Sequence, residues 1–523
     1  MKLLNPCCAA IIIASAFFNG GWAVPAKPGL TPFTQADGSI VYVRIMGDEH
    51  CHYYLSEDGD YLVETDGFLV AAEDGWQVTR RSPRSVARKT SVGLYDDSFP
   101  STGSPKVLVV VVDYPNATFS IDDPYDYFNR MLSEEGFSDY DATGSATDYF
   151  TEASYGLFTP QFDLYGPLTL ANNRSYYGAN DYYGDDEYAW MMAVEACEQL
   201  DDSVDFSQYD CDGDGYIDNI FVFYAGLGEN NGGASYTVWP HSWYISEATD
   251  SVYIFDGVQL DRYACSNEWN GSEPDGVGTF VHEFSHVLGL PDLYNTGTTS
   301  SPFTLGSWDV LDTGSYNNDS RTPPMYSIFE RYALGWIEPY IIEGEDSIAL
   351  AYISDGGDGC VIPTADDGEF FLLENRQQSR WDGYIPGHGM LIWHIDYDDE
   401  AWYNNEVNND ATHQRVDLEE ADDKRTAGTR AGDSFPGTGG ITSFTDDTSP
   451  GMLTWDGTAL GLPITDITEA DSIITFNVAK STQAGISPVI TDDESVVTIR
   501  DINLPKGMRV TIKNGKTYKW MDY

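Results

Sequence analysis

The sequence predicts an acidic, multidomain α+β protein, with a mixed domain between a small N-terminal β unit and a C-terminal β-sandwich. Three observations support this fold class. Hydrophobic strands alternate with helical segments over residues 101–340, helical periodicity is lost from residue 341 onward, and Asp-Gly pairs separate short aromatic-rich stretches before residue 80. Because a domain takes roughly 100–200 residues, a chain of 523 residues has room for several cores.

Composition excludes several classes of function. The chain has 84 acidic and 27 basic residues, and its formal net charge is −57. Such a charge repels nucleic-acid backbones and anionic membrane surfaces, so we expect no nucleic-acid partner. A disordered acidic chain is also excluded, because 41% of the residues are hydrophobic and 14% are aromatic.

The first residues have the anatomy of a secretory signal peptide. Lys2 precedes the apolar run Ala9–Phe18, and Gly21 and Ala23 provide the small residues of a cleavage site. The run is shorter than the roughly 20 residues that span a bilayer, and no later segment is long and apolar enough. We therefore expect a signal peptide over residues 1–23, secretion, and no membrane span.

Residues 24–100 are expected to form a pro-segment. Alternating stretches such as Ile40–Val43 and His52–Leu55 are separated by Asp-Gly pairs, which favour hairpins. Residues 80–89 hold five of the 27 basic residues. Such a stretch is typical of an exposed linker that a processing protease cleaves; a solvated strand end or an intramolecular salt-bridge face is the alternative.

The pattern over residues 101–340 predicts both strands and helices. Continuous β-branched runs indicate strands that are buried on both faces. Helical spacing, with a serine at one N-cap position, indicates helices between those strands. The expected strands are Lys106–Val112 and Phe221–Tyr224, and the expected helices are Ser145–Tyr155 and Glu187–Leu200.

Residues 341–480 predict a β-sandwich, because short hydrophobic strands are separated there by Gly, Asp and Asn. Examples of these strands are Glu369–Leu373, Gly389–Ile395 and Ile473–Val478. The last segment, 481–523, is relatively basic. Either a sorting tail or a final β-hairpin fits it.

The strongest chemical motif predicts a zinc site. His282 and His286 are four residues apart on an amphipathic helix, so both project from one face and can bind one Zn²⁺. Glu283 lies beside that metal, where it can take a proton from water. Gly289 ends the helix, and Asp292 can return as an oxygen ligand while a fourth position stays open. The alternative is a chance HExxH on an ordinary surface helix.

The segment HEFSHVLGLPDLY at 282–294 resembles the active-site helix of the immune inhibitor A-type secreted metallopeptidases, which are relatives of the metzincins. The resemblance extends through ATDYFTEASYGLF at 146–158, SWDVLDTGSYN at 307–317 and ENRQQSRWDGYIPGHGMLIWHIDYD at 374–398. It implies a metzincin-like catalytic domain and zinc-dependent endopeptidase activity on protein or peptide substrates. It also implies synthesis as a zymogen, with Glu283 as general base.

Two positions depart from the metzincin pattern. The third metzincin ligand is His, whereas this chain has Asp292, with Asn295 or a later carboxylate as alternatives. The Met of the turn beneath the metal corresponds to Leu311, an apolar replacement. Tyr316 follows that turn and could donate a hydrogen bond to the oxyanion, or could simply pack. For His241 we expect a structural role.

A second motif predicts a structural calcium site. Carboxylates occupy loop positions one, three, five and nine, glycine occupies position six, and a backbone carbonyl can add another oxygen. Phe221 replaces the glutamate of position twelve, so the loop is not a complete EF-hand. A solvated acidic turn is the alternative. The expected ligands are Asp210, Asp212, Asp214, the Tyr216 carbonyl and Asp218.

Two further hypotheses remain open at this point. A thiolate at Cys51 could block the zinc in the latent chain, or Cys51 could fill an apolar position of a strand. A non-catalytic adhesin or glycan-binding module is the rival to the peptidase. Such a module would have no need for Glu283 between two histidines, followed by Gly289 and Asp292.

Overall fold

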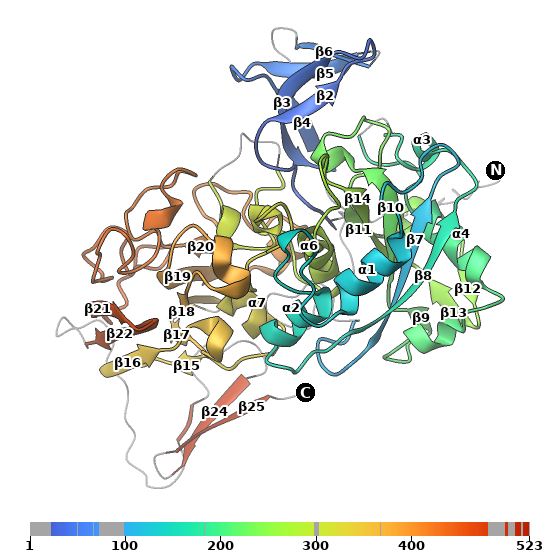
Figure 1. Ribbon diagram of the computed structural model, residues 1–523. Coiled ribbons are helices and arrows are strands. Elements are labelled where there is room, and N and C mark those ends of the chain that lie inside the picture. The colour runs from blue at the N-terminus through green and yellow to red at the C-terminus, as the bar shows by residue number, and fades with distance from the viewer. Residues whose placement is uncertain are drawn as a thin grey trace, which may run out of the picture.

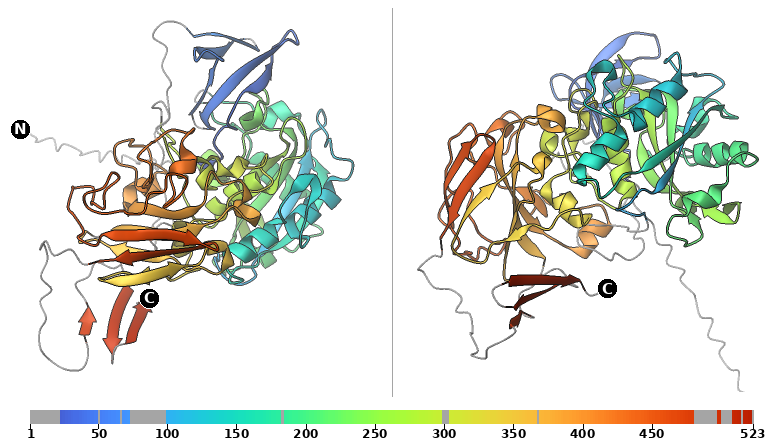
Figure 2. Two further views of the ribbon diagram at one scale, coloured as in Figure 1. Left: turned by 60° about the vertical axis from the view of Figure 1, so that its left-hand side comes forward. Right: turned by 60° about the horizontal axis from the view of Figure 1, so that its bottom comes forward.

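The computed structural model describes residues 22–49, 51–65, 67–72, 99–181, 184–297, 303–366 and 368–479, and the strands 497–499, 508–513 and 516–521. The basic stretch at 80–89 and residues 1–21 of the expected signal peptide lie outside the described residues. Figure 1 shows a small blue sheet above a mixed α/β part, with a yellow-to-orange β part beside it, and Figure 2 shows the same arrangement from two other sides. Within the described ranges, no helix is long and apolar enough to cross a membrane.

A six-stranded sheet forms the centre of the mixed part. Its order is β1-β11-β14-β10-β7-β8. The last four strands are parallel to one another, whereas β11 is antiparallel to β14 and β1 is antiparallel to β11. The strands are β1 (Trp22–Ala23), β7 (Lys106–Asp113), β8 (Gln161–Thr169), β10 (Ile220–Leu227), β11 (His241–Tyr244) and β14 (Arg262–Trp269).

Helices cover both faces of this sheet, as the buried strand pattern predicts. Val109 and its neighbours on one face of β7 pack with α1, α2 and α6, whereas Val110 and its neighbours on the other face pack with α4. The helices are α1 (Pro124–Ser133), α2 (Ala146–Ala153), α3 (Arg174–Tyr177), α4 (Met191–Leu200), α5 (Ile245–Ala248), α6 (Val277–Val287) and α7 (Ile328–Ala333).

Two expected helices are present, and both are shorter than the prediction: α2 ends at Ala153 instead of Tyr155. Ser145 caps α2 in a capping box with Asp148, which confirms the predicted N-terminus. The helix α4 begins at Met191 instead of Glu187, and the Glu187 N–H donates to the Ala179 carbonyl. A small sheet of β9 (Tyr216–Ile217), β12 (Tyr253–Phe255) and β13 (Val258–Leu260) lies beside this part.

The N-terminal part is a five-stranded antiparallel sheet in the order β2-β3-β4-β5-β6. Two of the predicted Asp-Gly turns, at 37–38 and 58–59, are confirmed: Gly38 and Gly59 have φ angles of 83° and 89°, in the left-handed region that glycine favours. Residue 66 and the pair at 74–75 lie outside the described residues. The strands are β2 (Thr31–Thr34), β3 (Ile40–Asp48), β4 (Cys51–Leu55), β5 (Tyr61–Thr65) and β6 (Phe68–Ala71).

Two sheets form the part that covers residues 340–479. Phe371 and Ile392 lie in a core shared with the second sheet, whereas Leu372 and Trp393 on the opposite face belong to the same core as α6. The hydrophobic core is therefore continuous across residue 340. The sheets are β15 (Tyr340–Ile341), β17 (Cys360–Pro363), β18 (Glu369–Arg376), β19 (Gly389–Asp396) and β20 (Val416–Leu418), and then β16 (Asp346–Leu350), β22 (Ile473–Val478) and β21 (Ile464–Ala470).

The remaining described strands come from the final segment. The strand β23 (Val497–Ile499) pairs with β24 (Met508–Lys513), which pairs antiparallel with β25 (Lys516–Met521). Figure 1 shows β24 and β25 in red below the rest of the molecule. Of the two predictions for this segment, the β-hairpin is the one whose strands the structure contains.

Candidate active site

The helix α6 carries the predicted zinc motif into the interior. Phe280 and Phe284 pack on one side of the helix, where the ring of Phe280 lies 4.5 Å from that of Phe221 on β10. His282 and His286 are fully buried. Gly289 has a φ of 90°, which ends the helix as predicted and turns the chain back toward the two histidines.

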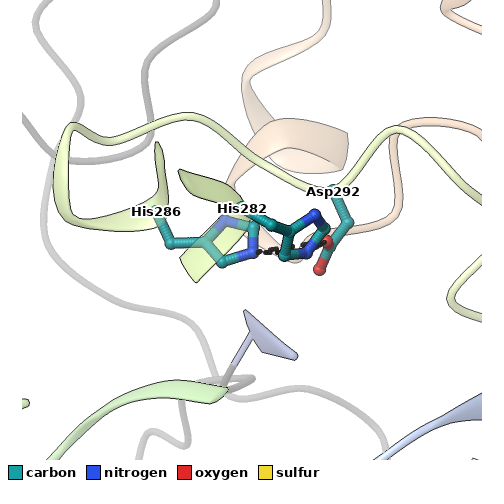
Figure 3. Close-up of side chains that lie close together, drawn as sticks. All are labelled: His282, His286 and Asp292. Carbon is teal, nitrogen blue, oxygen red and sulfur yellow. Dashed lines mark hydrogen bonds and ion pairs between the residues drawn. The ribbon is translucent and has the colours of Figure 1, made fainter. Parts of the chain in front are cut away.

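Three donor atoms converge beside this helix (Figure 3). The Nε2 atoms of His282 and His286 are 3.2 Å apart, and Oδ1 of Asp292 lies 3.1 Å from the first and 3.3 Å from the second. Ligand atoms about 2.05 Å from a tetrahedral Zn²⁺ lie about 3.3 Å from one another. The three separations therefore fit one tetrahedral ion with a fourth position to spare.

The hydrogen bonds of the two rings set their tautomers. Nδ1 of His282 is 2.7 Å from the Val310 carbonyl, and Nδ1 of His286 is 2.8 Å from the Leu290 carbonyl. Since a carbonyl oxygen only accepts, each Nδ1 donates its proton, and both Nε2 lone pairs face the shared point. Leu311, the residue in place of the metzincin Met, is buried in the same turn as Val310.

Burial and charge act differently on the two carboxylates of the site. Burial alone would raise the pKa of Asp292, but the neighbouring His286 and His282 hold it well below its ordinary value. The Asp292 Oδ1 atom is buried and has no hydrogen-bond donor within the described part of the chain. In contrast, burial raises the pKa of Glu283 to about 8, although His282 and the Val24 N–H oppose the shift.

Residues Trp22–Lys27, which we call the N-terminal segment, lie against the site. The β1 strand of this segment pairs with β11, and the Val24 N–H donates to Oε1 of Glu283 at 2.8 Å. The other oxygen of Glu283 has no hydrogen-bond partner among the described residues. The Trp22 ring lies 5.2 Å from that of His286. The cleavage-site pattern places Trp22 and Ala23 at the end of the signal peptide, so the sequence does not predict these contacts.

Three aromatic side chains hold the backbone of the N-terminal segment by donating to its carbonyl groups. The Tyr294 hydroxyl donates to Ala23 at 2.6 Å, the Trp239 indole to Val24 at 2.7 Å, and the Tyr316 hydroxyl to Pro25 at 2.6 Å. Tyr316 also accepts a hydrogen bond from Asn230 at 3.0 Å. The predicted oxyanion donor therefore lies near Glu283, and its proton already bonds a peptide carbonyl.

The predicted calcium loop brings only part of its ligand set together. Carboxylate oxygens of Asp210, Asp212 and Asp214 lie within 4.8 Å of one another. Asp218 does not join this group: its carboxylate accepts the Cys211 N–H at 3.0 Å, and burial raises its pKa to about 6. Tyr216 donates its N–H to Asp214 at 2.8 Å. The loop thus offers three carboxylates to a cation.

His241 forms a third group with two carboxylates, Glu49 from the N-terminal part and Asp186. Nδ1 of His241 lies 2.7 Å from the Trp239 carbonyl and 3.0 Å from Oε2 of Glu49, so this nitrogen carries a proton and is not a metal ligand. The prediction of a structural role for His241 agrees with this contact. Cys51 contributes no atom to any of the three groups found among the described residues.

Comparison with known proteins identifies the mixed part. Residues 104–333 match the profile of the immune inhibitor A peptidase M6 catalytic domain. The chain is 27% identical over 265 residues to immune inhibitor A of Bacillus thuringiensis subsp. alesti, covering 42% of this chain and 38% of that protein. It is 24% identical over 253 residues to the pre-pro-metalloprotease PrtV of Vibrio cholerae serotype O1, strain M66-2, covering 40% of this chain and 27% of that protein.

The chain therefore spans less than two fifths of the length of these curated relatives. The matched region includes α6 and all three donor atoms of the candidate zinc site. The sequence resemblance, the profile and the convergent geometry agree on one assignment. Residues 104–333 resemble the peptidase catalytic domain of the immune inhibitor A, M6 family.

Proposed function

We propose that this chain is an exported zinc-dependent endopeptidase that cleaves proteins or peptides and is made as a zymogen. The observation that carries the proposal is the convergence of His282, His286 and Asp292 at tetrahedral spacing beside the buried carboxylate of Glu283. The proposed organisation is a signal peptide over 1–23, a pro-segment over 24–100, and a metzincin-like catalytic domain over 101–340. A β-sandwich over 341–480 and a C-terminal tail follow.

His282, His286 and Asp292 would hold the zinc, which when bound would polarise the scissile carbonyl and acidify a water molecule. Glu283 acts as general base: it takes the proton of the attacking water and later gives it to the leaving amine. Tyr316 is the proposed donor to the oxyanion, because its hydroxyl already donates to a peptide carbonyl beside Glu283.

The latency of the zymogen rests on the N-terminal segment. The part of this segment that follows the proposed signal peptide, from Val24 onward, bonds Glu283, Trp239 and Tyr316 through its backbone, so a substrate could not reach these groups while it stays in place. The buried contact between Glu49 and His241 adds a second connection between the pro-segment and β11. Activation would require cleavage of the chain and release of both contacts.

We further propose that the loop of Asp210, Asp212 and Asp214 binds a structural calcium ion. The three carboxylates lie together, and Gly213 and Gly215 adopt φ angles of 80° and 93° that let the loop turn tightly. The loop leads directly into β9 and β10, the latter at the centre of the main sheet. Bound calcium would therefore stabilise the catalytic domain. The proposed ligand set also includes Asp218 and the Tyr216 carbonyl, although the Asp218 carboxylate accepts a hydrogen bond from the Cys211 N–H.

A metal-exchange assay on the activated chain tests the peptidase proposal. Casein cleavage should be lost after treatment with a zinc chelator, should return on addition of Zn²⁺, and should not return on addition of Ca²⁺ alone. Cleavage that persists in a chain shown to contain no zinc would refute the proposal. Retained zinc with no cleavage of any protein substrate would favour the adhesin hypothesis instead.

A further inference from the structure

A loop from the C-terminal β part reaches the candidate zinc site. The short helix α8 (Asp399–Tyr403) follows β19, and residues 404–409 then lie against residues 292–296 of the catalytic domain. Asn408 donates to the Leu293 carbonyl at 2.8 Å, and Asn295 donates to the Asn409 carbonyl at 3.0 Å. Two segments more than 100 residues apart in the chain are thus joined beside Asp292.

Asn405 in this loop makes a reciprocal pair of hydrogen bonds with Asp292. The Asn405 side-chain amide donates to Oδ2 of Asp292 at 2.6 Å, and the Asp292 N–H donates to Oδ1 of Asn405 at 2.8 Å. Both residues are buried: Asn405 is 2% exposed and Asp292 is fully enclosed. One side chain therefore fixes both the backbone and the carboxylate of Asp292.

This pairing gives the two carboxylate oxygens of Asp292 different roles. Oδ2 accepts a hydrogen bond from Asn405, whereas Oδ1 has no hydrogen-bond donor among the residues that the structure describes and faces the Nε2 atoms of His282 and His286. A neutral amide stabilises this orientation without adding a charge that would compete with the metal for the carboxylate. Partners of this kind orient metal ligands, and their loss typically weakens metal affinity about 10- to 100-fold.

The conformation of Asn405 suits asparagine. Its φ is 54°, in the left-handed region that asparagine tolerates better than most residues. The Thr296 hydroxyl donates to the Asn405 carbonyl at 2.5 Å, so the backbone of residue 405 is also tied to the catalytic domain. The loop is thus anchored on both sides of the contact with Asp292.

We infer that Asn405 is a positioning residue for the zinc site, and that the C-terminal β part thereby completes the catalytic centre. The inference rests on the proposed function, because it takes Asp292 as a zinc ligand. It adds that residues outside the matched catalytic domain, 104–333, control the geometry of the metal site.

The test compares zinc affinity and apoprotein stability in the full chain for two variants at position 405 and one control. Asn405→Ala removes both hydrogen bonds, whereas Asn405→Asp keeps the size and the acceptor oxygen but loses the donor to Oδ2. The control Asn408→Ala loses buried hydrogen bonds in the same loop, and these bonds go to the Leu293 and Val416 carbonyls instead of Asp292. Competition with a chromophoric chelator measures zinc affinity, and thermal unfolding of the zinc-free chain measures stability.

We expect both Asn405 variants to bind zinc about 10- to 100-fold more weakly than the unmodified chain. Asn408→Ala should lower the unfolding temperature of the zinc-free chain at least as much as the Asn405 variants do. Its zinc affinity should equal that of the unmodified chain. The inference is overturned if the Asn405 variants bind zinc as tightly as the unmodified chain, or if zinc affinity falls equally in Asn408→Ala. A different result would refute the proposed function: an unmodified chain that binds no zinc.

Discussion

Replacement of Glu49 by alanine should release the zymogen from latency without any cut in the chain. Glu49 belongs to the N-terminal part, and its Oε2 lies 3.0 Å from Nδ1 of His241 on β11, the strand that also pairs with β1. Both side chains are almost fully buried. Burial alone would lower the pKa of His241, but the nearby Cys265 and Glu49 raise it well above its ordinary value, which favours the charged imidazole at neutral pH.

The size of the effect follows from this geometry. Removing one partner of a buried ion pair costs about 3–5 kcal/mol, because the other charge is left uncompensated. Asp186 lies within 4.8 Å and can partly replace Glu49 as the partner of His241, so the lower end of that range applies. A loss of about 3 kcal/mol corresponds to roughly a 100-fold rise in the fraction of chains with an open site.

The assay uses uncleaved chains in which the basic residues of 80–89 are replaced by glutamine, so that processing there cannot contribute. Peptide hydrolysis by Glu49→Ala should exceed that of the parent by roughly 100-fold. Glu57→Ala, which removes an exposed carboxylate from the same sheet, should leave hydrolysis at the parent level. A Glu49→Ala chain that stays as latent as the parent, although zinc-loaded and folded, would refute the reasoning.

Three further predictions concern pH, calcium and processing. Burial raises the pKa of Glu420 to about 8, so the contribution of this carboxyl to the free energy of unfolding is full below about pH 4.5 and is lost as pH rises through 8. In denaturant titrations, Glu420→Gln should match the stability of the parent at pH 5 and exceed it by roughly 2–5 kcal/mol at pH 9. Equal stability of the two chains at both pH values would contradict this prediction. Calcium should raise the unfolding temperature of the parent and of the control Asp202→Asn, which changes an exposed carboxylate, and Asp210→Asn should abolish this rise. An unchanged rise in Asp210→Asn would exclude the calcium proposal. Limited proteolysis within 80–89 should raise peptidase activity, and a fully active uncleaved chain would contradict the zymogen.

The local parts of the site could be predicted from the sequence because short-range rules determine them. His282 and His286 share a face through helical periodicity, and Gly289 adopts the left-handed conformation that reverses the chain. Ser145 caps α2 as its position predicts, and the Asp-Gly pairs form turns between strands. In each case the residues that determine the structure are close together in the sequence.

The remaining features depend on contacts between distant segments. Asn405 meets Asp292 across 113 residues, and neither periodicity nor a motif marks an asparagine in a polar loop as a partner of a metal site. The same holds for Val24 and Glu283, which are 259 residues apart. The pattern of small residues around Ala23 indicated a cleavage site, and it carried no information about the strand pairing of Trp22 and Ala23 with β11.

The domain boundary expected near residue 340 is another case. Loss of helical periodicity marks a change of secondary structure there, yet Leu372 and Trp393 of the C-terminal sheet share a core with Phe284 of α6. A strand buried on both faces has the same apolar sequence whether its second face meets its own domain or another. The sequence pattern therefore predicts the strands correctly, but it does not indicate which part of the chain packs against their second face.

The most direct test of the central claim is a paired measurement on the activated chain and its Glu283→Ala variant. Both should contain one zinc per chain, since Glu283 lies beside His282, His286 and Asp292 but is not one of the three convergent donors. Only the unmodified chain should cleave casein, and removal of the general base should lower the rate at least 100-fold. Undiminished cleavage by Glu283→Ala at full zinc occupancy would contradict the account.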